Sequence, residues 1–180
     1  MPELLTPTTD LHDAWLACHR EWGPGVHEDG FAINPDDDVE SVDGFAAWVA
    51  RLHALPAARA WWIVEGDEVR GGIVLRHVTS ETTQRLGHVG YGIRPSARGR
   101  GLATWALGRV RSHGRAAGLD RLLVVCLDDN VGSITTIERN GGILEEVVDD
   151  PHGRLRRYRI DVDDNNDGDV TDPSPPHTAH

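Results

Sequence analysis

Hydrophobic positions repeat with a helical period in two stretches near the start of the chain. The first series has the spacings i, i+3, i+4, i+7 and i+11, and its members are Leu11, Ala14, Trp15, Cys18 and Trp22. It predicts an amphipathic helix, with Thr9 or Asp10 placed to cap its N-terminus. A second series, formed by Phe45, Trp48, Val49 and Leu52, predicts another helix. The stretch 28–43 between them has no period and carries seven acidic residues, so we expect an irregular segment there.

Short apolar runs bounded by turn residues predict strands. Leu4-Leu5 indicates a short first strand, and Trp61–Glu65 turns at Gly66-Asp67 into a hairpin partner that ends at His77. We predict a third antiparallel strand over 85–93, a long helix over 97–117, a strand over 122–126 and a helix over 133–140. A final antiparallel pair is predicted over 143–148 and 155–162. This order predicts an α+β fold with one mixed, mostly antiparallel central sheet flanked by helices.

Length and composition bound the rest. The 180 residues suit one domain, which we expect over 1–162, followed by an acidic tail, 163–180, with too few apolar side chains to fold. Part of that tail resembles the start of a calcium loop, but Ser174 stands where the closing acid should be, so we expect no metal site. The net charge of −11 argues against nucleic-acid and anionic-membrane partners. No signal-peptide or membrane-span pattern is present, which favours a cytoplasmic protein. The use of arginine without lysine hints at a bacterial source with a GC-rich genome.

The stretch Arg94–Thr104 carries the strongest chemical signal. Pro95 has no backbone donor and disfavours helix at the residue before it, so the preceding strand should end there. Gly99 and Gly101 let the backbone approach a ligand closely, and the helix that follows presents unpaired N–H groups at its positive end. Arg98 and Arg100 add positive charge. The stretch therefore predicts a binding site for a diphosphate-bearing cofactor.

Two other nucleotide-binding turns compete for this stretch. A dinucleotide-binding turn would have a third glycine where Thr104 stands, and the strand before it would be continuously apolar rather than glycine-rich. It remains a distant alternative. A phosphate-binding P-loop is excluded, because the chain has no lysine.

The residues Arg98-Gly99-Arg100-Gly101-Leu102-Ala103 match the pattern Arg/Gln-x-x-Gly-x-Gly/Ala. After a strand and a proline, this pattern resembles the acetyl-CoA signature of the GNAT N-acetyltransferase superfamily. The stretch Asn130–Gly142 is similar to the family's next helix, which starts with Asn-x-x-Ala/Ser. With both motifs in order, the resemblance covers roughly residues 60–160 and implies a GNAT-type fold.

The resemblance also implies where acetyl-CoA binds. The acetyl group would lie where the strands ending at Ile93 and Cys126 splay apart, and the backbone around Tyr91–Ile93 would pair with the pantetheine arm. The N–H groups of Arg100–Thr104 would hold the pyrophosphate. The implied cofactor-binding residues are Gly92, Ile93, Arg98, Gly99, Arg100, Gly101, Leu102, Ala103, Thr104, Asn130 and Ser133.

The catalytic groups are less defined. The family's general-acid tyrosine is replaced by Ile137, so a water or Tyr158 would have to protonate the thiolate. The family's base often comes from the strand before the cofactor turn, where His88 is the first candidate and His77, on the adjacent strand, the second. An isolated strand histidine can equally be structural. Tyr91 would line the acetyl pocket or pack in the core.

These motifs predict an acetyl-CoA-dependent N-acetyltransferase that acts on an amine of a small molecule or peptide. The acidic stretch 28–43 would favour a cationic acceptor, unless it is simply a solvated loop. The alternative is a non-catalytic acyl-CoA-binding or regulatory module on the same fold. Relatives commonly form dimers, so a homodimer is compatible with the resemblance.

Overall fold

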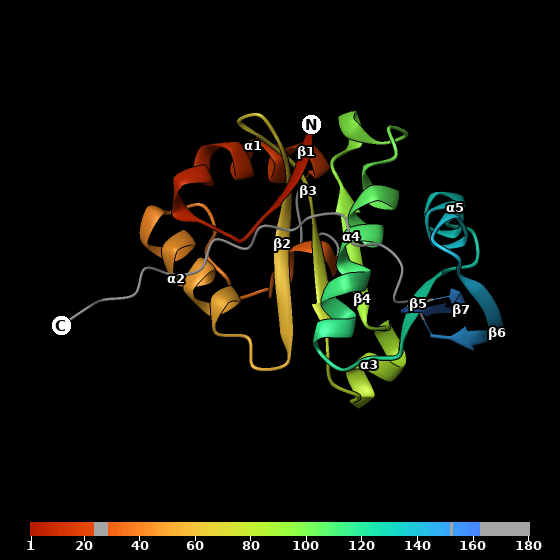
Figure 1. Ribbon diagram of the computed structural model, residues 1–180. Helices are drawn as coiled ribbons and strands as arrows, with labels where there is room; N and C mark the ends of the chain where they lie inside the picture. The colour runs from red at the N-terminus through yellow and green to blue at the C-terminus, as the bar shows by residue number, and fades with distance from the viewer. Residues whose placement is uncertain (24–28, 152, 163–180) are drawn as a thin grey trace.

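The computed structural model describes residues 1–23, 29–151 and 153–162 (Figure 1). Four antiparallel strands form one sheet in the order β1-β2-β3-β4, and three form a second in the order β5-β7-β6. The strands of the first sheet are β1 (Pro2–Leu5), β2 (Ala58–Glu65), β3 (Glu68–Arg76) and β4 (Val89–Ile93). Those of the second are β5 (Arg121–Leu127), β6 (Ile143–Asp150) and β7 (Gly153–Asp161). The helices are α1 (His12–Trp22), α2 (Val42–His53), α3 (Glu81–Leu86), α4 (Leu102–Ala116) and α5 (Val131–Arg139), with 3-10 turns η1 (Thr9–Leu11), η2 (Asp29–Phe31) and η3 (Pro95–Ala97).

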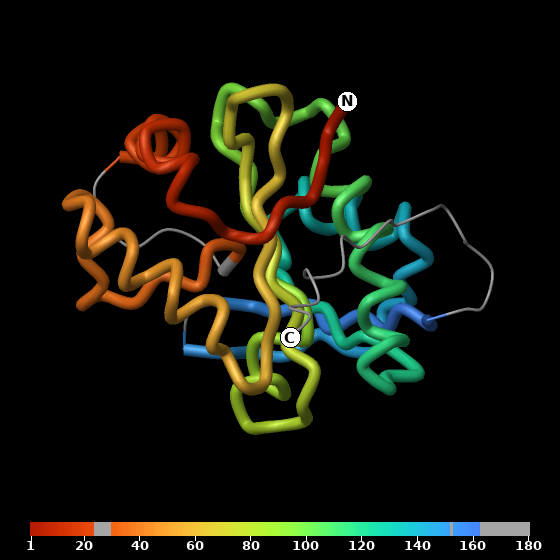
Figure 2. Tube along the Cα trace, turned by 60° about the vertical axis from the view of Figure 1, so that its left-hand side comes forward, coloured from red at the N-terminus to blue at the C-terminus, as the bar shows by residue number. Residues whose placement is uncertain are grey.

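The four-stranded sheet is covered on both faces (Figures 1 and 2). Successive strand residues point to opposite faces, so the neighbours Trp61 and Trp62 enter different cores. The side chain of Trp61 packs in the core beneath α4, whereas Trp62 packs with Trp15 and Trp48 of α1 and α2. The apolar faces predicted for the first two helices are therefore confirmed as core.

The turn η2 lies directly on the four-stranded sheet. A Cβ added to Gly30 would sit 2.3 Å from the Gly72 oxygen and 2.6 Å from the Gly92 nitrogen. A Cβ on Gly72 would in turn meet the Phe31 ring at 2.6 Å. Glycine is needed here because backbone packs on backbone, and the contact holds this segment against the end of β4.

The α+β class and the antiparallel hairpins are confirmed, but the single sheet expected from the sequence is divided. Between β4 and β5 the described residues form only an isolated bridge, Gly87 to Val124, beside which the His88 N–H donates to the Leu123 carbonyl at 2.7 Å. Beyond this bridge the two strands separate. Their separation opens the space in which the candidate site lies.

Several element boundaries differ from the sequence prediction. The strand predicted from residue 85 begins only at Val89, because residues 81–86 form α3, which is capped by the Ser80 side chain accepting the Thr83 N–H at 3.2 Å. The helix predicted from residue 97 begins at Leu102, because Gly99 and Gly101 have φ values of +75° and +80° and keep the loop non-helical. Neither Thr9 nor Asp10 caps the first helix: Thr8 caps the turn η1 by accepting the Asp10 N–H at 3.3 Å, and α1 follows with Leu11 at its N-cap and no side-chain cap.

The predicted tail, with its calcium-like motif, lies outside the described residues, as do residues 24–28 of the acidic segment. In the described part of the chain, no helix is both long and apolar enough to cross a membrane.

Candidate functional site

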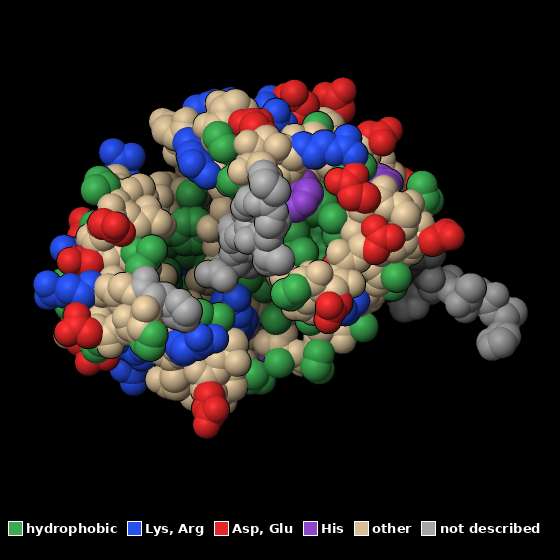
Figure 3. All heavy atoms as spheres, turned by 180° about the vertical axis from the view of Figure 1, so that it is seen from behind, with side chains coloured by type: hydrophobic (Ala, Val, Ile, Leu, Met, Phe, Trp, Pro, Cys, Tyr) green, Lys and Arg blue, Asp and Glu red, His purple; other side chains and the backbone are tan. Residues whose placement is uncertain are grey.

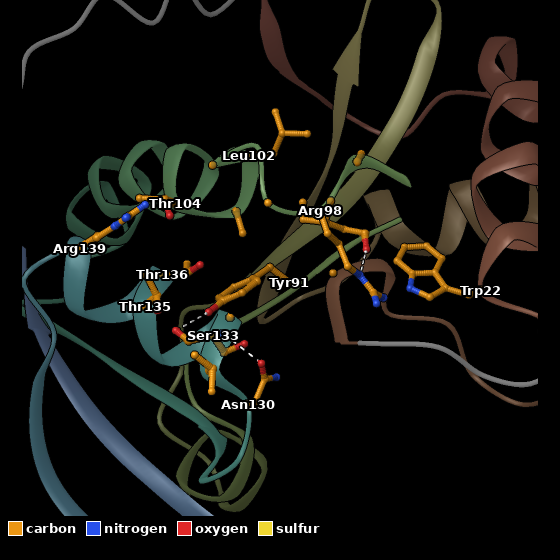
Figure 4. Close-up of a pocket in the computed structure, with 18 residues that line it drawn as sticks. Trp22, Tyr91, Arg98, Leu102, Thr104, Asn130, Ser133, Thr135, Thr136 and Arg139 are labelled. Atoms are coloured by element: carbon orange, nitrogen blue, oxygen red, sulfur yellow. Dashed lines mark hydrogen bonds between the residues drawn. The ribbon is translucent and has the colours of Figure 1, made fainter. Parts of the chain in front are cut away.

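A cavity of about 550 Å³ lies between β4, the loop 98–101, the start of α4 and the start of α5 (Figure 4). It brings together most of the residues that the two sequence motifs had singled out. These are Tyr91, Gly92, Ile93, Arg98, Gly99, Gly101, Leu102, Ala103, Thr104, Asn130 and Ser133. Motifs about 30 residues apart in the sequence thus form one site.

The floor of the cavity at α4 is made of backbone groups of the kind that can bind an anion. The Trp105 N–H donates to the Gly101 carbonyl at 2.9 Å, so the three preceding N–H groups, of Leu102–Thr104, have no acceptor within the helix. These groups stand at the positive end of a 15-residue helix. Gly99 and Gly101 leave open space where a Cβ would point. A phosphate group fits such a surface without displacing a side chain.

The two arginines of this loop behave differently. Arg98 lines the cavity, and its Nε donates to the Ile93 carbonyl at 2.9 Å. The side chain of Arg100 is instead paired with Glu65, with its Nη2 2.9 Å from the Glu65 Oε2. Arg98 can therefore place positive charge in the cavity, whereas the predicted contribution of the Arg100 side chain is not supported by its position.

Helix α5 forms the opposite wall. The Asn130 side chain caps the helix by accepting the Ser133 N–H at 3.0 Å, as expected for an asparagine at this position. One face of the helix, with the spacing of helical neighbours, lines the cavity through Gly132, Thr135, Thr136 and Arg139. None of these four was predicted, although this spacing could have identified them once Asn130 was taken as the cap.

Tyr91 points from β4 toward α5, and its hydroxyl donates to the Ser133 carbonyl at 3.4 Å (Figure 4). Burial raises the pKa of this phenol to about 12, so it stays protonated at neutral pH. The phenol is therefore a neutral hydrogen-bond donor on the wall of the cavity, where it also packs against the core.

His88 does not line the cavity. Its ring Nδ1 accepts the Leu123 N–H at 2.8 Å, which replaces a backbone acceptor between β4 and β5. Burial lowers the pKa of His88, and an occupied Nδ1 lone pair keeps the proton of the neutral ring on Nε2. Nε2 is buried and has no hydrogen-bond partner among the described residues. The geometry therefore favours the structural interpretation of His88 over that of a general base.

The other candidate acid–base groups also lie elsewhere. His77 follows β3 at the end away from Ile93, about six strand residues or roughly 20 Å along the sheet. Tyr158 is fully buried, and its hydroxyl donates to Glu138 at 3.1 Å. Ile137, at the position of the family's tyrosine, is fully buried in the core.

On the side of α1 the cavity is bordered by Trp22, which the sequence pattern placed on the apolar face of the first predicted helix. The Trp22 ring packs edge-on against Phe31, with centroids 5.5 Å apart. The preceding residue, Glu21, accepts hydrogen bonds from Ser96 and Arg94. Both donors lie at the start of residues 94–101, which we call the cofactor loop. Burial alone would raise the pKa of Glu21, but the hydrogen bonds from Ser96 and Arg94 outweigh it and lower the pKa below its ordinary value.

Acidic residues of the stretch 28–43 are engaged within the fold. Asp37 pairs with Arg51, Glu40 pairs with Arg20 at 2.5 Å, and Asp38 caps the turn before α2 by accepting the Ser41 N–H at 3.1 Å. These three carboxylates stabilise local structure, so they do not support the cation-binding role that the sequence suggested for this stretch.

Comparisons with known proteins agree with this geometry. Residues 4–143 match the family model of the acetyltransferase (GNAT) domain. Similar solved structures include the Microcin C7 self-immunity acetyltransferase MccE in complex with acetyl-CoA and AMP, at 16% identity over 89% of this chain and 92% of that one (TM-score 0.65). Mycobacterium smegmatis RimJ in complex with CoA-disulfide is similar at 20% identity over 89% and 81% (TM-score 0.66).

A spermidine N-acetyltransferase chimera, SpeG from Vibrio cholerae with hSSAT, is similar at 14% identity over 89% of this chain and 95% of that one (TM-score 0.63). No curated protein matches the chain significantly. The structural likenesses, all at low identity, show the fold. Because the family model covers most of the chain, the protein belongs to the GNAT acetyltransferase family.

Proposed function

We propose that the protein is an N-acetyltransferase that transfers the acetyl group of acetyl-CoA to an amine. The observation that carries this proposal is the single cavity shared by the glycine loop, the separated end of β4 and the capped end of α5. Solved relatives of the same fold, MccE and RimJ, hold acetyl-CoA or a CoA derivative.

The described residues fit acetyl-CoA. The N–H groups of Leu102–Thr104 would hold the diphosphate, and Arg98 would add positive charge beside it. The edge of β4 that faces away from β3 would pair with the pantetheine amides over Tyr91–Ile93, where β5 has moved away. Asn130 and Ser133 would contact the other side of that arm, and Arg139, beside Thr104 in Figure 4, would face the nucleotide end.

The transfer itself requires few side chains. As the amine nitrogen forms a bond to the acetyl carbon, the carbon–sulfur bond breaks, and the electron pair leaves with sulfur, which then takes a proton. Tyr91, protonated on the cavity wall, would stabilise that sulfur by turning its hydroxyl from the Ser133 carbonyl, to which it donates at 3.4 Å, toward the ligand. The chain otherwise contributes orientation and exclusion of water.

We propose that the proton released by the amine is transferred to water and not to a histidine. The Nδ1 lone pair of His88 is occupied, and His77 lies at the far end of its strand. A water chain from the cavity to solvent removes this proton without a dedicated base.

The acceptor class is an amine on a small molecule or peptide. SpeG-type relatives act on spermidine, but the engaged carboxylates of residues 37–40 do not favour a polycation here. The two cysteines are buried and form no disulfide, which is compatible with the reducing cytoplasm in which we place the enzyme. A homodimer remains a prediction.

The proposal is tested by thiol release from acetyl-CoA in the presence of amines that include polyamines, aminoglycosides, amino acids and peptides with a free N-terminus. We expect at least one amine to accelerate release well above the buffer rate, with an acetylated product of matching mass. Calorimetry with the folded protein that detects no acetyl-CoA binding would contradict it. Binding without release across the panel would instead support a non-catalytic module.

A further inference from the structure

The carboxylate of Glu21, which belongs to neither sequence motif, links α1 to the cofactor loop. We call its hydrogen bonds to Arg94 and Ser96 the tether. Glu21 Oε2 accepts the Arg94 Nε at 2.5 Å and the Ser96 hydroxyl at 3.0 Å. Its second oxygen accepts the Ser96 backbone N–H. The pairing is shielded, since the Glu21 and Arg94 side chains are only 23% and 15% exposed. Charge-assisted hydrogen bonds of this kind are stronger than neutral ones.

The tether holds the turn that aims Arg98 at the cavity. Pro95 has no N–H, so Ser96 is the first donor of η3 and needs an acceptor from outside the turn. Glu21 supplies that acceptor, and the Ala97 N–H closes the turn on the Arg94 carbonyl at 2.9 Å. Arg98 follows immediately, with its Nε fixed on the Ile93 carbonyl.

The same contacts of Glu21 also fix the wall of the cavity on the side of α1. Trp22 follows Glu21 at the end of α1 and borders the cavity, and Figure 4 shows its ring beside the Arg98 side chain. Its other contact, Phe31, is itself held on the sheet at Gly72. Displacement of the Glu21 carboxylate would therefore move Arg98, through the turn η3, and Trp22, through the end of α1.

We propose that Glu21 is a positioning residue that sets the cofactor loop and Trp22 together, and that Trp22 is a contact of the bound acyl-CoA. This inference rests on the proposed function. Electrostatically, Glu21 would otherwise repel a diphosphate. Its carboxylate instead accepts hydrogen bonds from Arg94 and Ser96 and so holds the cofactor loop in place. Removing the charge should therefore weaken acetyl-CoA binding and not strengthen it.

The back of the molecule is hollowed, with hydrophobic side chains in the floor of the hollow (Figure 3). Trp22 can report ligand binding by fluorescence. Trp15, Trp48, Trp61 and Trp62 are buried in the two cores, and the signal of the half-buried Trp105 is separated from that of Trp22 by the variant Trp22→Phe.

The test is an acetyl-CoA titration followed by calorimetry and tryptophan emission, on the full chain and its variants. In the wild type we expect binding with a change in emission that Trp22→Phe largely removes. Glu21→Gln should raise the Kd about tenfold and reduce the emission change, because the lost hydrogen bonds release both walls. The matched control is Glu40→Gln, which removes the exposed pair with Arg20, the residue next to Glu21, and should leave the Kd unchanged.

The outcomes separate the two proposals. If the folded wild type binds no acetyl-CoA, the proposed function fails and this inference fails with it. If the wild type binds, and Glu21→Gln matches Glu40→Gln in both Kd and emission change, the positioning role alone is wrong. A Glu21→Gln protein that does not fold is replaced by Glu21→Asp, which keeps the charge but shortens the reach, and the same increase in Kd is expected. A Kd for Glu21→Asp equal to that of Glu40→Gln would also overturn the inference.

Discussion

The two sides of the candidate site are built from different materials. The side of α4 consists of backbone: two glycines with positive φ and the N–H groups of a helix N-terminus. The side of α1 consists of side chains held by long-range contacts, such as Glu21 on Ser96, which are 75 residues apart in the sequence. A site made of backbone requires glycine and proline at fixed spacings, and this pattern can be recognised in the sequence. A site made of side chains from distant segments gives no such sequence pattern.

This contrast predicts different responses to substitution. On the α4 side, changes in backbone freedom should act on ligand binding. At the bridge between Gly87 and Val124, where His88 accepts the Leu123 N–H, changes should act mainly on stability.

The largest effect is expected for Gly101→Asp, which places a carboxylate where the diphosphate would lie. We expect the Kd for acetyl-CoA to rise by at least about 100-fold, or roughly 2.7 kcal/mol, in calorimetry. Gly118→Asp is the matched control, because Gly118 has the same φ of +80° and the same open surroundings at the other end of α4. Equal affinities of the two variants would argue against an anion site at Gly101.

His88 separates the structural role from the catalytic one. His88→Ala removes the acceptor of the Leu123 N–H, so we expect the free energy of unfolding to fall by about 1–3 kcal/mol in denaturant titrations. His88→Asn keeps an acceptor near the position of Nδ1 and should recover part of that loss. The acetyl-CoA affinity should stay within about twofold of the wild type. A loss of turnover at full stability would instead restore His88 as a base.

The same residue predicts a pH dependence. Because burial lowers the pKa of folded His88 below its ordinary value of about 6.5, the unfolded chain binds a proton that the folded chain does not as the pH falls through this range. The free energy of unfolding should therefore decrease from pH 7 toward pH 5. His88→Asn should show a smaller decrease in paired denaturant titrations, and identical slopes would contradict the burial of a neutral ring.

Substitutions of Arg98 and Arg100, two arginines of one loop, should have smaller and unequal effects on acetyl-CoA affinity. Arg98→Ala should weaken acetyl-CoA binding about tenfold, because Arg98 lines the cavity. Arg100→Ala should change the Kd less than about twofold, because its side chain pairs with Glu65 outside the cavity. A reversed order in calorimetry would show that the loop rearranges when it binds the ligand.

The smallest effect concerns Asn130, whose side chain caps α5 and lines the cavity. Asn130→Ala should cost about 1 kcal/mol of stability, the usual value of an N-cap, together with a few-fold loss of affinity. Asn130→Ser should keep the cap, so any loss of affinity that remains in thermal-shift and binding measurements reports the ligand contact alone. If Asn130→Ser binds as the wild type does, Asn130 serves only the helix.

Much of the fold followed from residue patterns. The helix faces around Trp15 and Trp48, the hairpin at Gly66-Asp67 and the cap at Asn130 were all predicted, because local periodicity and turn chemistry decide them. The resemblance anticipated that the strands ending at Ile93 and Cys126 separate, but the sequence did not predict two sheets joined by a bridge at Gly87 and Val124, beside which His88 accepts the Leu123 N–H. The start of α4 was also missed, since an arginine-rich loop with two glycines can be read as helix until its φ angles are known.

In the site, the sequence predicted the cofactor loop but not the direction in which each side chain points. Arg98 and Arg100 have the same charge and are two residues apart, yet only a long-range partner, Glu65, decides which of them faces the cavity. Glu21 was missed for the same reason, because its partners Arg94 and Ser96 are remote in the sequence.

The most direct test of the central claim is hydrogen–deuterium exchange with and without acetyl-CoA. If backbone amides hold the ligand, peptides that cover 91–105 and 130–136 should exchange more slowly in its presence, whereas peptides from α2 should be unchanged. Exchange at 91–105 that is unaffected by saturating acetyl-CoA, or protection confined to α2, would contradict the account.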